Sequence, residues 1–478
     1  MRILVSRILF LYNKNRSFEK ETTTMEEERR EKSFFDELDK KEAQGTEVKD
    51  LDRIAKLQHT NNLIIEKLDQ EPTMEMTSLY NYEKEKYSSN YSNYQLPGID
   101  LLTPPTSTTN QVDYTEAIAK QLTDILNLYD IDAKYIQAYK GPRKTVFEFS
   151  LSKEIDAKLI KQIEERILEN ELNSKILVIP LFQRETLGII VPNEERNLVF
   201  LRELYEPYAN RAHSLRFFMG KRNNGQENIR LKQFQHLFLF GATGSGKSLL
   251  LHSIILSVLL QARPDEVKLL LIDPKKIEFT PYRSLPHLLA PVINHGEMTP
   301  YILQYIVRMM EKRLDTFSAY HVKDIVGYNQ LEDIKEKMPE VLVIADEISD
   351  FVEEESFKQI LQSILQLSKY TGVHLILSTN HVDATKRILE ELQTGFNRKI
   401  AFYHTKTKNS ALVLQSEFQT RNLLGDGDMV YFFPGSKYPM NLQGANITNE
   451  EIKRVADYCA SQATPMFDEV FLEDFREG

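Results

Sequence analysis

The segment that most constrains the fold runs from residue 236 to 260 and reads "HLFLFGATGSGKSLLLHSIILSVLL". Its first residues have the apolar character of a buried strand, and the apolar run at its end predicts a buried helix. Between them lies G-x-x-x-x-G-K-S. The backbone N–H groups of such a turn can face phosphate oxygens, and the helix N-terminus adds partial positive charge. The segment therefore predicts a phosphate-binding loop, here called the P-loop, in an α/β fold.

The P-loop provides the first set of candidate site residues. Lys247 is expected to neutralise phosphate charge and to act in catalysis, and the Ser248 hydroxyl is expected to bind a metal ion. We therefore predict ATP and Mg²⁺ as cofactors. The predicted nucleotide-binding residues are Gly241, Ala242, Thr243, Gly244, Ser245, Gly246, Lys247 and Ser248.

A second apolar strand, "VLVIADE" (341–347), ends in two carboxylates. Asp346 is expected to complete the Mg²⁺ site with Ser248, and Glu347 to orient or deprotonate the attacking water. A strand-terminal Asp-Glu pair can also be simply solvated, but the P-loop favours the catalytic interpretation. A water-activating glutamate favours a nucleotide hydrolase over a nucleoside kinase.

The next strand, "HLILSTN" (374–380), ends in Thr379 and Asn380. A polar side chain at this position can touch the γ-phosphate or the water and report hydrolysis to the following loop. We predict this catalytic sensor role for Asn380. The alternative is that these residues only cap the end of the strand.

Apolar strands alternate with helix-length segments from about residue 230 to 461, which indicates a mainly parallel sheet buried on both faces. The expected strands are 236–241, 267–273, 341–346, 373–379 and 399–404. A smaller α/β subdomain is predicted before them, and the highly charged start has too few apolar residues to form a core. The predicted division is a disordered charged arm and linker at 1–95, the small subdomain at 96–205, the P-loop subdomain at 206–461 and a tail at 462–478.

Composition excludes several classes. The formal net charge is −10 with a pI of about 5.7, which argues against a wholly basic nucleic-acid coat protein but not against DNA contact through a local groove. The single cysteine, Cys459, excludes an intramolecular disulfide and a cysteine-based zinc site. No stretch is long and apolar enough to span a membrane, and no signal peptide is indicated, so a cytoplasmic location is predicted.

Four further blocks stand out along the chain. They are "LPGIDLLTPP" (96–105), "VPNEERNLVFLREL" (191–204), "LLLIDPKKIEFTPYRSLPHLLAPVI" (269–293) and "LLGDGDMVYFFPGSKYPMNLQGANIT" (423–448). They resemble the FtsK/SpoIIIE family of double-stranded-DNA translocases. They occur in the family's order and are far more specific together than the P-loop alone.

The resemblance implies a homohexameric ring with double-stranded DNA threading its centre and ATP sites at subunit boundaries. It implies that 96–205 is the outer, or alpha, subdomain and that 206–461 is a RecA-like motor. Asp346, Glu347 and Asn380 fall on the family's nucleotide positions, although Asn380 replaces a usual glutamine. Asp273 and Lys275 match the family segment as well, without an assigned role.

The sequence also departs from the family pattern. The membrane spans and winged-helix module common in the family are not recognised, so the arm is expected to reach a membrane or protein partner instead. Two usual arginines are replaced, by His381-Val382 in place of Arg-Pro and by Ala411. The candidate cations for a neighbouring subunit's ATP site are Arg398, Lys399 and Arg387, and those for DNA contact are Lys386 and Arg387.

The leading hypothesis is an ATP-driven pump of double-stranded DNA, for chromosome segregation or for transfer of plasmid or mobile-element DNA. One alternative is an FtsK-like ATPase of a protein-secretion or conjugation apparatus. Another is a nucleotide-gated structural ring with weak hydrolysis. The acidic triplet Glu353 to Glu355 fits the pump least well, because carboxylates near a DNA channel repel phosphate unless they point away or pair with Lys358.

Overall fold

The structure is a computed structural model in which part of the chain is described. The described residues are 91–105, 114–152, 155–170, 176–181, 186–209, 215–222, 225–334, 337–349, 351–352, 355–405, 411, 413–414, 418, 420–435 and 439–467. Most of the predicted arm (1–95) and of the tail (462–478) lies outside these residues. No helix within the described ranges is apolar over a length sufficient to cross a bilayer.

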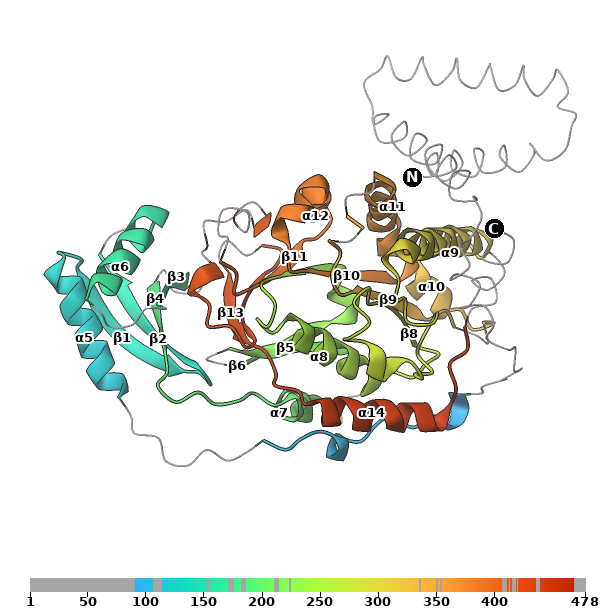
Figure 1. The fold of residues 1–478 in the computed structure, drawn as a ribbon, viewed down its shortest axis with the longest axis horizontal. Coiled ribbons are helices and arrows are strands. Elements are labelled where there is room, and N and C mark those ends of the chain that lie inside the picture. The colour runs from blue at the N-terminus through green and yellow to red at the C-terminus, as the bar shows by residue number, and fades with distance from the viewer. Residues whose placement is uncertain are drawn as a thin grey trace, which may run out of the picture. The chain divides into compact units, whose positions relative to one another are not determined.

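A four-stranded antiparallel sheet forms the smaller of two sheets, in the order β1-β2-β4-β3 (Figure 1). Its elements are α5 (Thr115–Leu128), β1 (Ala133–Lys140), β2 (Lys144–Leu151), α6 (Ala157–Glu169), β3 (Leu177–Leu181) and β4 (Thr186–Pro192). Leu122 of α5 and Ile163 of α6 are buried with Phe147 and Phe149 of β2 in one cluster. The apolar sides of α5 and α6 therefore pack against the apolar side chains of the strands on one face of the sheet.

The other face of the small sheet is apolar as well. Val146, Leu177 and Ile190 are buried in the same cluster as residues of the larger sheet. Successive strand residues point to opposite faces, so Val146 and Phe147 bury in different clusters. The small sheet is therefore covered on both sides.

The larger sheet has nine strands in the order β6-β5-β13-β12-β11-β7-β10-β9-β8. The strands are β5 (Arg216–Arg222), β6 (Gly225–Arg230), β7 (His236–Phe240), β8 (Val267–Ile272), β9 (Glu340–Ala345), β10 (Val373–Thr379), β11 (Arg398–Phe402), β12 (Asp428–Phe432) and β13 (Met440–Gln443). The five strands from β11 to β8 are parallel, which confirms the predicted sheet. The antiparallel extension by β12, β13, β5 and β6 was not predicted, and its strands β6 (GQENIR) and β13 (MNLQ) lack the apolar run that marks the parallel strands.

Helices cover both faces of the larger sheet. They are α7 (Leu201–Tyr205), α8 (Lys247–Leu259), α9 (Thr299–Ala319), α10 (Ile325–Asn329), α11 (Glu355–Thr371), α12 (Leu389–Thr394) and α14 (Asn449–Gln462). Helices α8 and α14 pack into one apolar cluster, and α9 and α11 pack into the other, on opposite sides of the sheet (Figure 1). Helix α8 is buried almost all round, as its apolar run predicts, and Cys459 of α14 is buried as expected.

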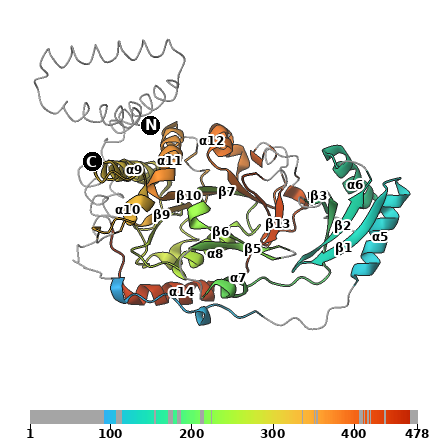
Figure 2. The same cartoon turned by 180° about the vertical axis from the view of Figure 1, so that it is seen from behind.

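The block at 96–105 lies along α14, in both views of the molecule (Figures 1 and 2). Leu102 is 1% exposed and belongs to the cluster that contains α8 and α14. The Arg454 guanidinium donates to the Leu101 carbonyl (3.1 Å), and the Thr103 amide donates to the Glu451 carboxylate (3.1 Å). This part of the predicted small subdomain therefore packs on the P-loop subdomain, and the division at 205/206 remains a proposal.

We predict that Leu102→Ala lowers the free energy of unfolding by about 2–4 kcal/mol, because it removes a fully buried side chain from the core. Leu128→Ala is the matched control, since Leu128 is 69% exposed and the same truncation there creates no cavity. Urea unfolding of both variants measures the difference. Equal effects of the two substitutions would show that 96–105 does not pack on α14.

Candidate nucleotide-binding site

Strand order brings three polar segments to one edge of the larger sheet. β10 pairs in parallel with β7 on one side and with β9 on the other. The carboxyl ends of these strands lead into the P-loop, Asp346 and Glu347, and Asn380. Ligands of open α/β sheets bind at this edge, so the three predicted motifs lie where one nucleotide can reach them all.

The P-loop joins β7 to α8 through a backbone that favours glycine. Gly246 is left-handed (φ +111°) and serves as the N-cap of α8 without any side-chain cap. Gly244 is also left-handed (φ +75°). The Gly241 amide is bound to the Thr379 carbonyl (3.3 Å), which ties the loop to β10. The free N-terminus of a 13-residue helix at the end of this loop is suited to bind phosphate.

Lys247 is held within its own loop. Its ammonium donates to the carbonyls of Gly241 (2.8 Å) and Ala242 (3.0 Å), and the side chain is buried. Burial lowers the pKa of Lys247 to about 8, although the carboxylates of Asp346 and Glu347 oppose this shift. A buried cation is shielded from water, so it interacts strongly with an anionic ligand bound in the P-loop.

Ser248 contacts a carboxylate that sequence reasoning did not identify. Its hydroxyl donates to Oε1 of Glu278 (2.9 Å), and His252 lies 3.5 Å from Oε2 of the same carboxylate. Hydrogen bonds from His252 and Ser248 lower the pKa of Glu278. Only the block similarity at 269–293 pointed to this region, since Glu278 lies in a loop whose path the sequence does not specify.

Asp346 follows β9 and is buried at the same edge. Burial raises the pKa of Asp346 to about 6, the nearby Glu278 carboxylate raises it further, and Lys247 opposes the shift. Ser248, Asp346 and Glu278 together offer hard oxygen donors, the ligand type that Mg²⁺ prefers, and Mg²⁺ usually takes only one or two carboxylates from protein. The residues present therefore fit the predicted metal ion.

Glu347 is fixed by four donors. The Thr379 hydroxyl (2.8 Å) and the Ser349 amide (3.2 Å) donate to Oε1, and the Asn380 amide (3.0 Å) donates to Oε2. Lys275 forms an ion pair with Oε2 at 3.4 Å. Although burial alone would raise the pKa of Glu347, the hydrogen bonds from Asn380 and Thr379 lower it, so the group is held ionised.

Lys275 and Asp273, which had no assigned role, both contact residues of the site or of the loop that leads to it. Lys275 forms an ion pair with Glu347 that sequence reasoning missed. The Asp273 carboxylate accepts from the Phe279 amide (3.0 Å), which shapes the loop that carries both Lys275 and Glu278. The loop after β8 therefore supplies a cation and a carboxylate to the site.

Asn380 contributes its backbone to Glu347 and leaves its side-chain oxygen available. Within the described residues, Oδ1 of Asn380 is buried without a hydrogen-bond partner. An unsatisfied buried amide oxygen beside the Glu347 carboxylate matches what the predicted sensor needs, since such an atom gains a hydrogen bond from a ligand. Thr379 binds Glu347 directly and is a further site residue.

The weaker candidate cations lie apart from this cluster. Lys386 and Arg387 are exposed in a 3₁₀ segment, Val382–Ile388, and Lys386 pairs with Asp383 at 3.7 Å. Arg398 begins β11, at the opposite edge from the subunit's own P-loop, and donates to Tyr431 and to the Gln233 carbonyl. Lys399 is buried, which lowers the pKa of its ammonium and disfavours reach to another subunit.

The acidic triplet is only partly visible. Glu353 and Glu354 lie outside the described residues, whereas Glu355 is exposed at the start of α11. Lys358 forms its ion pair with Glu391 at 3.7 Å, across to α12. The expected pairing of Lys358 with Glu353 or Glu354 concerns residues that lie outside the described part of the chain.

The strand order and the P-loop define a P-loop NTPase fold. The FtsK/SpoIIIE family matches residues 201–430, and the FtsK alpha domain matches residues 96–193. The two matches follow one another along the chain; one covers the small sheet, and the other covers the larger sheet except β13 and the end of β12. The chain belongs to the FtsK/SpoIIIE family.

Similar curated proteins carry the same family name. The DNA translocase FtsK of Oceanobacillus iheyensis is 30% identical over 396 residues, which cover 80% of this chain and 50% of that protein. The DNA translocase FtsK of Clostridium acetobutylicum is 32% identical over 391 residues, covering 79% and 51% respectively. The chain thus spans about half the length of these relatives.

Two solved structures are similar at lower identity. The conjugation coupling protein TcpA of pCW3, a monomer form with ATPγS, matches with TM-score 0.48 and 19% identity, over 72% of this chain and 99% of TcpA. The cytoplasmic domain of the type VII secretion ATPase EccC of Thermomonospora curvata matches with TM-score 0.46 and 20% identity, over 54% and 32% respectively.

We predict that Asp346→Asn stabilises the metal-free protein by about 1–3 kcal/mol at pH 8. The folded state raises the pKa of Asp346 from 3.8 to about 6, so the cost of ionisation is absent below about pH 4 and complete above about pH 6. The gain should therefore disappear at pH 4. Urea unfolding without Mg²⁺ at both pH values measures it.

Glu347→Gln is the control of opposite sign. The fold lowers the pKa of Glu347, so ionised Glu347 stabilises the native state above its unfolded pKa, and the amide should destabilise it at pH 8. If both variants shifted the free energy of unfolding in the same direction, the two environments assigned here would be wrong.

Proposed function

We propose that the chain is an ATP-hydrolysing motor that translocates double-stranded DNA as a homohexameric ring. The observation that carries the proposal is the convergence of the P-loop, Asp346 and Glu347 on one sheet edge, with β10 between their strands. Family membership supports DNA as the substrate, because the curated relatives are DNA translocases.

The site residues have distinct roles in this proposal. Bound Mg²⁺ would be held by Ser248 and Asp346 and would neutralise charge on the phosphates. Lys247 exchanges its hydrogen bonds to two loop carbonyls for hydrogen bonds to phosphate oxygens, so its ammonium keeps its full set of acceptors. Glu347 accepts the proton of the attacking water, and Asn380 orients that water by accepting a hydrogen bond from it at its unpaired Oδ1.

The contacts of Glu347 describe a resting arrangement. Its two oxygens already accept from Thr379, Ser349, Asn380 and Lys275. A general base needs a lone pair directed at water, so at least one of these contacts must lengthen before hydrolysis. The exposed partner, Lys275, is the contact we expect to release, since its ion pair at 3.4 Å is the longest of the four.

Arg398 is the candidate that best suits a neighbouring subunit's ATP site. It lies at the amino ends of the parallel strands, away from its own P-loop, whereas Lys399 is buried. The location within the cell follows from this proposal as cytoplasmic, with the N-terminal arm as the expected link to a membrane or protein partner.

We predict that long linear duplex DNA stimulates ATP hydrolysis by the wild type and that Glu347→Gln lowers kcat by roughly 10²- to 10⁴-fold. Lys247→Ala should weaken nucleotide binding as well, because it removes the buried cation. Steady-state ATPase rates with and without duplex measure these effects. Full turnover by Glu347→Gln would refute the base assignment, and hydrolysis indifferent to DNA would favour the protein-secretion alternative.

We predict that Lys386→Glu combined with Arg387→Glu weakens duplex binding at all sequences. The slope of log K for binding against the logarithm of salt concentration should become less steep by about one for each lost phosphate contact. The control reverses Lys158 and Lys161, two exposed lysines of α6. Binding isotherms at several salt concentrations compare the pairs. Equal effects of the two reversals would exclude a specific contact by the 382–388 segment.

A further inference from the structure

A loop at 424–428 lies directly against the P-loop. The Gly427 amide donates to the Ser245 carbonyl at 2.9 Å. A Cβ atom on Gly246 would lie 2.3 Å from the Gly427 nitrogen. The two backbones are therefore in van der Waals contact, and no side chain fits at position 246. Any displacement of this loop therefore displaces the turn that is expected to hold phosphate.

The loop has a backbone that needs support. Gly425, Asp426 and Gly427 are consecutive left-handed residues, with φ of +80°, +48° and +84°. Left-handed conformations are unfavourable for a residue with a side chain, and such strain persists only where surrounding contacts fix it. Within the loop, the Asp428 amide donates to the Gly425 carbonyl (3.0 Å), and contacts from outside the loop add to this support.

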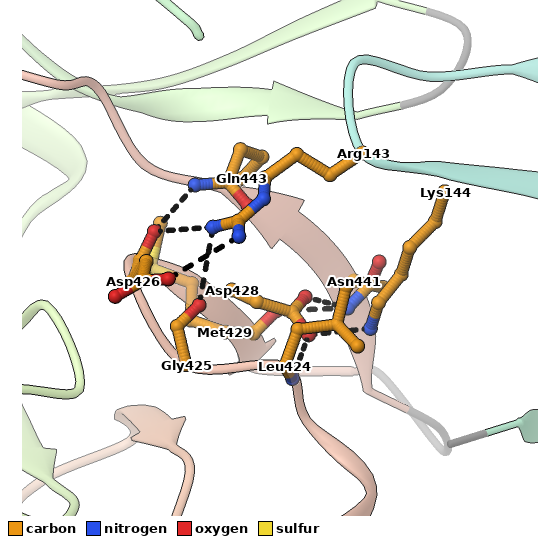
Figure 3. A network of polar contacts seen from close by, with 9 residues as sticks. All are labelled: Arg143, Lys144, Leu424, Gly425, Asp426, Asp428, Met429, Asn441 and Gln443. Carbon is orange, nitrogen blue, oxygen red and sulfur yellow. Dashed lines mark hydrogen bonds and ion pairs between the residues drawn. The ribbon is translucent and has the colours of Figure 1, made fainter. Parts of the chain in front are cut away.

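Two residues of the small sheet's β1–β2 turn supply those contacts (Figure 3). The Arg143 guanidinium donates to the Gly425 carbonyl (3.3 Å) and the Asp426 carbonyl (2.9 Å) and pairs with the Asp426 carboxylate (3.3 Å). The Lys144 ammonium pairs with the Asp428 carboxylate at 2.5 Å, and both side chains are almost fully buried. A planar guanidinium that binds successive carbonyls fixes their orientation as well as their position.

The larger sheet holds the same loop from its other side. Gln443 of β13 donates to the Asp426 carbonyl (2.9 Å), and Asn441 donates to the Asp428 carboxylate (3.1 Å). The Asp428 carboxylate also accepts from the Leu424 amide at 2.6 Å. Asp428 is thus a buried centre that joins the two sheets, because its carboxylate binds a cation from one and an amide from the other.

The turn that carries Arg143 is itself braced by the block at 191–204. The Asn193 amide donates to the Arg143 carbonyl (2.9 Å), and the Asn197 amide donates to the Pro142 carbonyl (2.8 Å). The Asn193 side chain donates to the Gly141 carbonyl (2.9 Å). The turn is therefore bound to the segment that joins the two sheets, which favours transmission of any movement of the small sheet to the 424–428 loop.

We propose that Arg143 and Lys144 are positioning residues for the P-loop: through the loop at 424–428 they link the small subdomain's β1–β2 turn to nucleotide binding at Ser245 and Gly246. This rests on the proposed binding of ATP. By thermodynamic reciprocity, if the turn favours one P-loop conformation, bound nucleotide must in return stabilise the turn. The link thus predicts a response to nucleotide in the other subdomain.

The test is hydrogen–deuterium exchange of the full chain with and without Mg²⁺ and ATPγS. In the wild type, ATPγS should slow exchange at 241–250, at 424–429 and at 139–147. In Arg143→Ala the slowing at 241–250 should persist at saturating ATPγS, with a dissociation constant raised by about fivefold or more, while the slowing at 139–147 disappears. A purely structural role for Arg143 would not separate the two responses.

Three variants make the result specific. Arg166→Ala, in α6 of the same subdomain, removes a half-exposed arginine that pairs with Glu169 at 2.9 Å, and this variant should behave as wild type. Asparagine at 426 tolerates the left-handed backbone, and Asp426→Asn removes only the charge of the exposed ion pair with Arg143 while both backbone carbonyl contacts of Arg143 remain. In this variant ATPγS should therefore slow exchange at 139–147 nearly as much as in the wild type. Arg143→Lys, which keeps the charge without the planar fork, should be intermediate and replaces Arg143→Ala if that variant does not fold.

The outcomes separate this inference from the proposed function. Slower exchange at 241–250 in the wild type with no change at 139–147 would overturn the link while leaving ATP binding intact. Transmission to 139–147 that survives Arg143→Ala would overturn the role of Arg143. No slowing at 241–250 would overturn ATP binding itself, and the link with it.

Discussion

The parallel pairing of β10 between β7 and β9 is the constraint on which the site depends. It brings the end of the P-loop strand and the end of the carboxylate strand to the same edge, with Thr379 and Asn380 between them. The Gly241 amide and the Glu347 carboxylate are both bound to residues at the end of β10. A shift of β10 would therefore disturb the P-loop and the Glu347 carboxylate together, which suits the sensor role proposed for this strand.

Much of this site could be predicted from the sequence because its chemistry is local. The P-loop is a contiguous pattern between a strand and a helix, and Asp346 and Glu347 follow an apolar strand directly. Parallel strands expose their carboxyl ends at one edge, so these motifs meet without further information. The buried character of α8 followed from the same kind of local pattern.

Other parts depended on the path of loops. Glu278 reaches Ser248 and Lys275 reaches Glu347 only because the loop after β8 turns back to the site, a path supported by the Asp273 carboxylate. The block at 96–105 packs on α14, more than 340 positions away along the chain, through contacts such as Thr103 with Glu451. Periodicity carries no information about contacts of this kind, because they depend on tertiary packing.

The two sheets, the 424–428 loop and the P-loop form one continuous set of contacts. The proposed motor requires such continuity between ATP chemistry and movement of DNA.

The most direct test of the proposed translocation is displacement of a third strand from a triplex placed far along a linear duplex. With ATP and Mg²⁺, the wild type should displace it at a rate that depends on its distance from the loading end, and Glu347→Gln should not. Rapid ATP hydrolysis without any displacement would contradict translocation as the function of this chain.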